Sequence, residues 1–203
     1  MDSQATVETI YVLRPSFSGR GPGHGLVFAN LESLLAPPRR ILRPTAGGFP
    51  PLRETPLLIQ EQSGKATLDD LEASFSGYWL VSDRLKNAFE DNDPQGFAFA
   101  RCDVKMADGS DAGERYLCDV LRVIDALDEE RSETRIDVGD DFVNGKFYHV
   151  TTGSSLIFRR EVIGSAHTFR TPYSGFVFCD ESMRAALVSG GFSGVETEDA
   201  SDY

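Results

Sequence analysis

The stretch GYWLVSDRLKNAFED, residues 77–91, decides the fold class. Its apolar run, Tyr78 to Val81, has the length and composition of a buried strand. The hydroxyl of Ser82 can accept a free N–H group of a first helical turn. Leu85 and Phe89 then recur on one helical face. The stretch therefore predicts a buried strand that turns directly into an amphipathic helix.

A second stretch, GFVFCDESMRAALVSGG (175–191), repeats this pattern about a hundred residues later. A strand over Phe176–Phe178 ends at Cys179 and Asp180, and a helix follows. Two such elbows could be catalytic corners, but a hydrolase nucleophile elbow reads GxSxG and neither stretch does. We expect both elbows to be framework, with a buried thiol at the second strand end.

The remaining patterns favour strands over helices. Strands are expected over 56–62, 97–104, 115–124, 176–179 and near 195–199, with two short strands around Gly153. Residues 97–123 resemble a β-hairpin with a long loop. We predict an α+β fold with a mixed or mostly antiparallel sheet, a few short helices and an irregular Pro/Gly-rich N-terminal segment.

Composition divides the chain into three parts. Residues 1–55 form an expected irregular arm or lobe, because eight of the ten prolines fall between Pro15 and Pro56. This arm includes an expected short helix near Leu31–Ala36 and the basic run PPRR at 37–40. Residues 56–197 are the expected α+β domain. Residues 198–203 would be an acidic tail.

Net charge and cysteine usage limit the function classes. A net charge of −12 disfavours nucleic acid as a partner, because binding phosphates needs clustered Lys and Arg. No apolar stretch approaches the roughly 20 residues that a membrane helix requires. The chain starts without the basic and apolar regions of a secretory signal. Three widely spaced cysteines indicate reduced thiols and a cytoplasmic location.

The clearest charge feature is an acidic segment over 119–141. It holds nine acids and three arginines, a local net charge of −6. A calcium loop is not indicated, because the DxDxDG register is absent. Either a solvated loop or a patch for a basic protein partner would explain the segment. The candidate partner-binding residues are Asp125, Asp128, Glu129, Glu130, Asp137, Asp140 and Asp141.

Catalytic chemistry finds little support in the sequence. A small hydrolase using His149 or His167 with Cys179, with Ser182 or with a carboxylate pair stays open as an alternative. The histidines show no HExxH or other metal spacing. The glycines of SGRGPGHG (18–25) do not form a phosphate-binding loop. We predict no catalytic residue, no metal and no cofactor.

Several stretches together resemble a known family: WLVSDRLKNAFE, YLCDVLRVIDALDEERS, HTFR and FVFCDESMRAALVSGGFSGVE, in that order. They are similar to the bacterial immunity proteins of polymorphic toxin systems, specifically the immunity protein 11 type. The resemblance covers about residues 75–197. The motif positions are Ser82, Leu85, Phe89, Asp128, Ser132, Phe169, Arg170, Gly191 and Gly194.

The resemblance implies a cytoplasmic binder, encoded beside a toxin, that neutralises this toxin without catalysis. It implies structural roles for the motif residues: Ser82 would cap a helix, Arg170 would hold a buried carboxylate or carbonyl groups, and Gly194 would permit a tight turn. The expected partner is the toxin protein, with no nucleic acid and no membrane. An adaptor or chaperone that grips a partner through the basic arm is the second alternative, and pairing of two copies through edge strands stays open.

Overall fold

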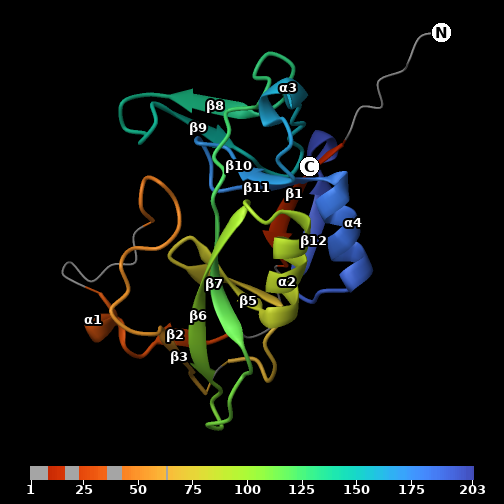
Figure 1. Cartoon of the computed structure of the whole chain (residues 1–203). Helices are drawn as coiled ribbons and strands as arrows, with labels where there is room; N and C mark the ends of the chain where they lie inside the picture. The colour runs from red at the N-terminus through yellow and green to blue at the C-terminus, as the bar shows by residue number, and fades with distance from the viewer. Residues whose placement is uncertain (1–8, 17–22, 36–42, 63) are drawn as a thin grey trace.

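The computed structural model describes residues 9–16, 23–35, 43–62 and 64–203. Two larger sheets lie one above the other in Figure 1, and a small hairpin stands at the upper edge. The PPRR run at 37–40 lies outside the described residues. The fold is α+β with mostly antiparallel pairing, which confirms the predicted class.

The larger sheet has six strands. They are β2 (Leu26–Phe28), β3 (Leu57–Gln60), β4 (Leu71–Phe75), β5 (Tyr78–Ser82), β6 (Phe97–Lys105) and β7 (Arg115–Val120). Their order is β2-β3-β6-β7-β5-β4, and the β3–β6 pair is parallel while the others are antiparallel. The β6–β7 hairpin predicted over 97–123 is confirmed.

The second sheet has four strands and draws them from both ends of the chain. They are β1 (Ile10–Pro15), β10 (Thr168–Arg170), β11 (Val177–Asp180) and β12 (Val195–Asp199). The order is β10-β11-β1-β12, so β1 pairs on both sides. Successive side chains of a strand point to opposite faces. Val12 and Leu13, both buried, accordingly belong to two different core clusters.

The two predicted elbows are framework and meet in space. α2 (Asp83–Asn92) follows β5, α4 (Glu181–Gly190) follows β11, and Figure 1 shows the two helices side by side on one flank. Leu85 and Phe89 of α2 share a core cluster with Met183 and Leu187 of α4. The elbows thus join the two sheets through a common core.

Side chains at the strand ends cap both helices. The hydroxyl oxygen of Ser82 accepts from the N–H of Leu85 at 3.3 Å, and the carboxylate of Asp180 accepts from the N–H of Met183 at 3.0 Å. Each cap satisfies one N–H group that has no partner inside the helix. This contact is the local reason why each strand passes into a helix without a loop.

The remaining elements are short. They are α1 (Leu31–Leu34), β8 (Arg135–Val138), β9 (Lys146–His149), α3 (Arg160–Ile163) and the 3-10 helix η1 (Ala200–Asp202). Instead of two strands around Gly153, the structure has β9 alone and isolated bridges, because residues 150–154 leave the ladder.

Both ends of the chain carry more regular structure than expected. β1 lies inside the segment that we expected to be irregular, and its partners come from the last 30 residues. Residues 198–203, the expected acidic tail, complete β12 and η1. Ala200 is fully buried, and its carbonyl accepts from the N–H of Leu156 at 2.8 Å. The division at residue 55 stays a prediction.

Candidate functional site

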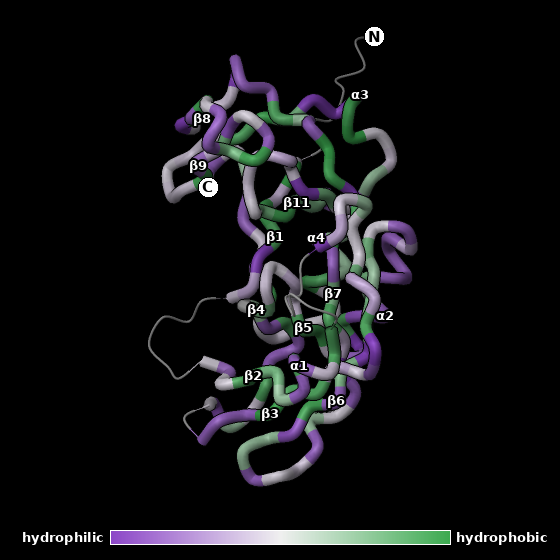
Figure 2. The backbone as a smooth tube through the Cα atoms, turned by 90° about the vertical axis from the view of Figure 1, so that its left-hand side faces the viewer, coloured by the Kyte–Doolittle hydropathy of each residue, from purple (hydrophilic) through white to green (hydrophobic). Residues whose placement is uncertain are grey.

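The β8–β9 hairpin stands away from the two sheets and carries much hydrophilic sequence (Figure 2). The cross-strand pairs Arg135–His149 and Asp137–Phe147 share one face of this hairpin. The connecting turn contains an Asn-Gly pair, and Gly145 has φ of 78°, a value that favours glycine. Its closure is marked by a hydrogen bond from the N–H of Gly139 to the carbonyl of Gly145 at 3.0 Å.

The opposite face anchors the hairpin to the body of the protein. Tyr148 is buried, and its ring lies edge-on to that of Tyr173 at 5.0 Å. Its hydroxyl donates to Glu129, which also accepts from Lys146. Burial and then this carboxylate raise the pKa of Tyr148, while the ammonium of Lys146 and the phenol together lower the pKa of Glu129. Glu129 is therefore a structural anion, held inside the molecule's own contacts.

Apolar side chains are exposed on and around this hairpin. Val143 is 100% exposed and Val138 is 79% exposed, whereas monomeric surfaces usually carry such residues singly. The rings of Phe142 and Phe147 stack at 6.0 Å, and Phe147 meets the ring of His149 edge-on at 5.0 Å. An aromatic row thus crosses the hairpin in an exposed, unusually apolar region.

Asp137 lies beside this aromatic row and is paired. Its two carboxylate oxygens accept from Arg135 at 2.9 and 2.8 Å. One of them also lies 2.8 Å from Nε2 of His149. Arg135 and then His149 hold the pKa of Asp137 below its usual range. The carboxylate therefore stays ionised through the neutral range and fixes both neighbouring side chains.

Asp125 and Asp128 also have partners inside the chain. Asp125 accepts from the hydroxyl of Tyr173 at 3.2 Å and lies 3.9 Å from Arg159. Asp128 accepts from the N–H of Arg131 at 3.2 Å and lies 3.9 Å from its guanidinium. These carboxylates thus contribute to local structure as well as to surface charge.

The other three predicted acids are different. Glu130, Asp140 and Asp141 are exposed, and nothing in the described part of the chain pairs with them. Asp140 and Asp141 lie in the turn of the hairpin, next to Phe142 and Val143. The structure thus divides the seven predicted residues into four with internal partners and three that are free for a partner.

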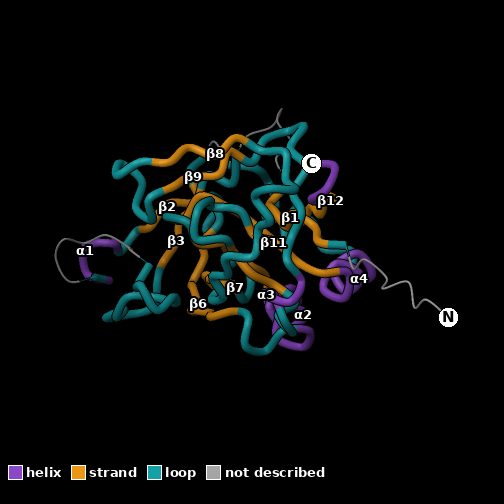
Figure 3. Tube along the Cα trace, turned by 90° about the horizontal axis from the view of Figure 1, so that it is seen from above, coloured by secondary structure: helices purple, strands orange, loops and turns teal. Residues whose placement is uncertain are grey.

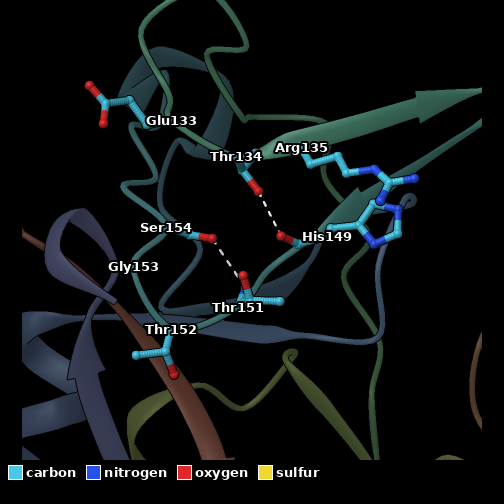
Figure 4. A pocket seen from close by; sticks show the side chains of 8 residues that line it. All are labelled: Glu133, Thr134, Arg135, His149, Thr151, Thr152, Gly153 and Ser154. Atoms are coloured by element: carbon cyan, nitrogen blue, oxygen red, sulfur yellow. Dashed lines mark hydrogen bonds between the residues drawn. The ribbon is translucent and has the colours of Figure 1, made fainter.

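A cleft of about 600 Å³ opens where β8 and β9 separate (Figure 4). Residues 150–154 loop out opposite Thr134, between the Arg135–His149 pair and the Glu133–Ser155 bridge. The hydroxyl of Thr134 donates to the carbonyl of His149 at 2.8 Å. The cleft lining is mainly hydroxyl groups and backbone, with the imidazole of His149 at its rim, and it presents no nucleophile-base pair.

The motif residue Arg170 joins the two sheets. Its Nε donates to the carbonyl of Val120 at 2.9 Å, and its guanidinium lies 3.8 Å from the fully buried carboxylate of Asp119. Asp119 also accepts from Nε of Arg43 and from the N–H of Gly48, each at 2.7 Å. This carboxylate therefore attaches the segment around 43–48 to β7 and β10.

The motif residues Ser132 and Phe169 also lie in the interior framework. The hydroxyl of Ser132 accepts from the N–H of Ile157 at 2.9 Å, and the N–H of Asp128 donates to the carbonyl of Ile157 at 2.8 Å. Phe169 is fully buried, with its ring 5.6 Å from that of Phe178. The motif marks packing and turn positions, apart from the exposed hairpin.

The thiol-based enzyme alternative has no accessible nucleophile. Cys102, Cys118 and Cys179 are all buried, and burial raises the pKa of each thiol, that of Cys102 to about 12. His167 points its Nδ1 at the carboxylate of Asp180, 2.7 Å away. At Cys179, therefore, neither exposure nor protonation state suits nucleophilic attack.

Sequence reasoning missed the aromatic part of the site. Phe142, Val143 and Phe147 flank the Asn-Gly pair, a strong hairpin signal that was available in DDFVNGKF. Among the described helices, none is both long and apolar enough to cross a bilayer. The described residues include no group of three or more His, Cys, Asp or Glu side chains placed to hold a metal ion.

Comparison with known proteins gives a family and no individual relative. No curated protein matches the chain. A family model described as an immunity protein family (Imm11) matches residues 9–202, which includes β1 and extends well beyond the expected range of 75–197. Since this match spans nearly the whole chain, and since membership indicates a toxin-neutralising role, the protein described here belongs to the immunity protein family Imm11.

Proposed function

We propose that this protein neutralises its toxin by binding it with the β8–β9 hairpin and occluding the toxin's functional surface. The observation that carries the proposal is the combination at the hairpin turn. Unpaired Asp140 and Asp141 lie directly beside Phe142 and Val143, and Val143 is fully exposed. Exposed apolar side chains rimmed by charge are typical of protein-binding sites.

The two kinds of side chain would contribute differently. Aromatic and aliphatic groups that lose their water on binding supply most of the affinity at protein interfaces. Phe147 and Val143 are the candidates for this role. The free carboxylates would attract a basic toxin surface, raise the association rate and aid selectivity. We propose that this attraction acts in the cytoplasm of the producing cell, on a toxin encoded beside this chain.

Two double variants of the full chain test the charge contribution. Asp140→Lys with Asp141→Lys reverses the free acids of the turn. Asp91→Lys with Glu114→Lys makes the same change of net charge at exposed acids outside the hairpin, which also have no partner among the described residues. Binding to the toxin encoded beside this gene would be measured by stopped-flow fluorescence at low and at high salt.

The turn variant is expected to associate about tenfold more slowly at low salt, with a weaker salt dependence, because electrostatic steering acts mainly on the association rate. The control variant should lose much less. Equal losses in both variants would show that only total charge matters. An unchanged rate in the turn variant would exclude this hairpin as the contact.

Phe147→Ser tests the apolar contribution, with Val188→Ser of α4 as the control at another exposed position. We expect the hairpin variant to speed dissociation and to reduce rescue of cells that express the toxin. The control should protect as the unmodified chain does. If the toxin is not bound at all by the unmodified chain, the adaptor alternative would take the place of this proposal.

A further inference from the structure

The outer edge of β8 presents backbone groups that have no partner. The bond between the N–H of Gly139 and the carbonyl of Gly145 sets the alternation of this antiparallel ladder. Arg135 and Asp137 therefore direct their backbone groups toward β9, while Ile136 and Val138 direct theirs away. Consistent with this register, Tyr148, which pairs with Ile136, donates its N–H outward to the carbonyl of Tyr173 at 2.9 Å.

Nothing described in the chain covers this edge. No hydrogen bond to a described residue involves the outward backbone groups of Ile136 or Val138. Figures 1 and 3 agree that β8 is the outermost strand, with β9 between it and the rest of the protein. Open edges of this kind are templates for an additional strand.

We propose that β8 receives an extended basic segment of the toxin as an added strand. This inference rests on the proposed function, since it names how the same hairpin recognises the toxin. Main-chain hydrogen bonds would supply affinity, and alternate side chains would supply selectivity. The hairpin therefore recognises backbone geometry as well as charge.

The charges along the edge define the segment that fits. Asp137 lies on the exposed face of β8, and Asp140 and Asp141 continue from its end. A Lys or Arg on the added strand beside Asp137 would share this carboxylate. On the other face, Val138 is 79% exposed and suits an apolar neighbour. The expected segment thus alternates basic and apolar residues.

A second copy of this chain is a poorer occupant. Pairing two copies through β8 would bring together two chains of net charge −12 along their most acidic segment. A basic strand from another protein has no such penalty. The experiment below distinguishes these occupants, because self-pairing would protect the edge before any toxin is added.

Amide hydrogen exchange of the full chain, followed by NMR, reads the edge directly. In the free protein the amides of Ile136 and Val138 should exchange rapidly, and that of Asp137 slowly, because it faces β9. With the toxin encoded beside this gene in excess, Ile136 and Val138 should exchange at least about tenfold more slowly. The amide of Asp137 serves as the internal control for an intact hairpin.

A matched pair of variants removes one backbone donor. Val138→Pro deletes the outward N–H, and proline is tolerated on an edge strand when its nitrogen faces solvent. Val138→Ala shortens the side chain and keeps the N–H. We expect the proline variant to bind the toxin at least about tenfold more weakly than the alanine variant, with slow exchange retained at Asp137.

Each outcome has one meaning. Protection of Ile136 and Val138 together with the proline effect supports strand addition. A tight complex that leaves both amides unprotected, or equal binding by the two variants, overturns strand addition and leaves the proposed function standing. Protection that is already present in the free protein and depends on concentration assigns the edge to a second copy. No complex and no rescue of cells overturns the proposed function, and strand addition with it.

Discussion

Arg84 holds Asp70 in a two-pronged ion pair. Nε of Arg84 donates to one carboxylate oxygen at 2.8 Å, and a terminal nitrogen donates to the other at 2.6 Å. Asp70 also accepts from the hydroxyl of Ser82 at 2.6 Å and from the N–H of Ser193 at 2.8 Å. One carboxylate therefore connects β4, the first elbow and the turn that precedes β12.

Replacing this carboxylate should destabilise the fold. Asp70→Asn weakens a charged, hydrogen-bonded contact that is mostly buried, so we expect a loss of about 2 kcal/mol in the free energy of unfolding at neutral pH. Urea unfolding followed by circular dichroism measures it. A loss below about 0.5 kcal/mol would show that solvent can replace the network.

The same pair predicts a pH dependence. Burial alone would raise the pKa of Asp70, but hydrogen bonds from Arg84 and Ser82 outweigh it and hold the pKa well below its usual range. A lowered folded-state pKa stabilises the protein above the unfolded value of about 3.9, and this contribution is lost as the pH falls below that value. The stability gap between the unmodified chain and Asp70→Asn should therefore narrow in acid. A gap that stays constant down to about pH 2.5 would contradict the assignment.

Gly194 occupies a position that a side chain cannot share. Its φ is +75°, and a Cβ there would lie 2.5 Å from the carbonyl oxygen of Leu71 and 2.6 Å from Cβ of Asp69. Gly194→Ala should cost about 3 kcal/mol through strain and collision. Gly109→Ala is the control, because φ is +84° and no atom lies within 4 Å, so only about 1 kcal/mol of backbone strain is expected. Thermal unfolding of both variants makes the comparison, and similar losses would mean that the close approach relaxes.

Asp119 should be among the costliest acids to remove. Asp119→Ala leaves the guanidinium of Arg170, itself largely buried, and that of Arg43 without their shared anion. Loss of one member of a buried ion pair costs about 3–5 kcal/mol. Asp103→Ala on β6, where the side chain is exposed, should stay within about 0.5 kcal/mol. If both variants unfold at the same urea concentration, Asp119 does not join the sheets as described.

The three thiols should resist modification in the native protein. Burial keeps Cys102, Cys118 and Cys179 protonated and inaccessible. A colourless disulfide reagent that releases a coloured thiolate should therefore report no reaction until denaturant is added, and then three equivalents. Rapid reaction of one thiol in the folded protein would reopen the nucleophile alternative for that residue.

Local patterns were sufficient where partners lie close in the sequence. The two elbows and the β6–β7 hairpin were predicted because apolar runs, caps and alternation mark them. β1 was missed: its sequence IYVLRP is short, the proline-rich segment follows it, and its partners lie more than 160 residues away. Pairing over that separation leaves no local periodicity to detect.

The candidate site was predicted only in outline. Counting acids located the segment, but the count does not separate Glu129, held by Lys146 and Tyr148, from Asp140, which is free. That distinction depends on contacts made by residues far along the chain. The exposed aromatic row depends equally on how β9 packs, since Tyr148 faces the interior and Phe147 therefore faces outward.

The position of β1 between β11 and β12 has a consequence for protein synthesis. The first strand made can find its partners only after the last strands have left the ribosome. At about 5–20 residues per second, a chain of 203 residues takes about 10–40 s to complete. During that interval the apolar side chains of β1 have no sheet to enter. Protection against a toxin would therefore depend on finished chains already present, and a translational pause near the end would yield polypeptides unable to close the four-stranded sheet.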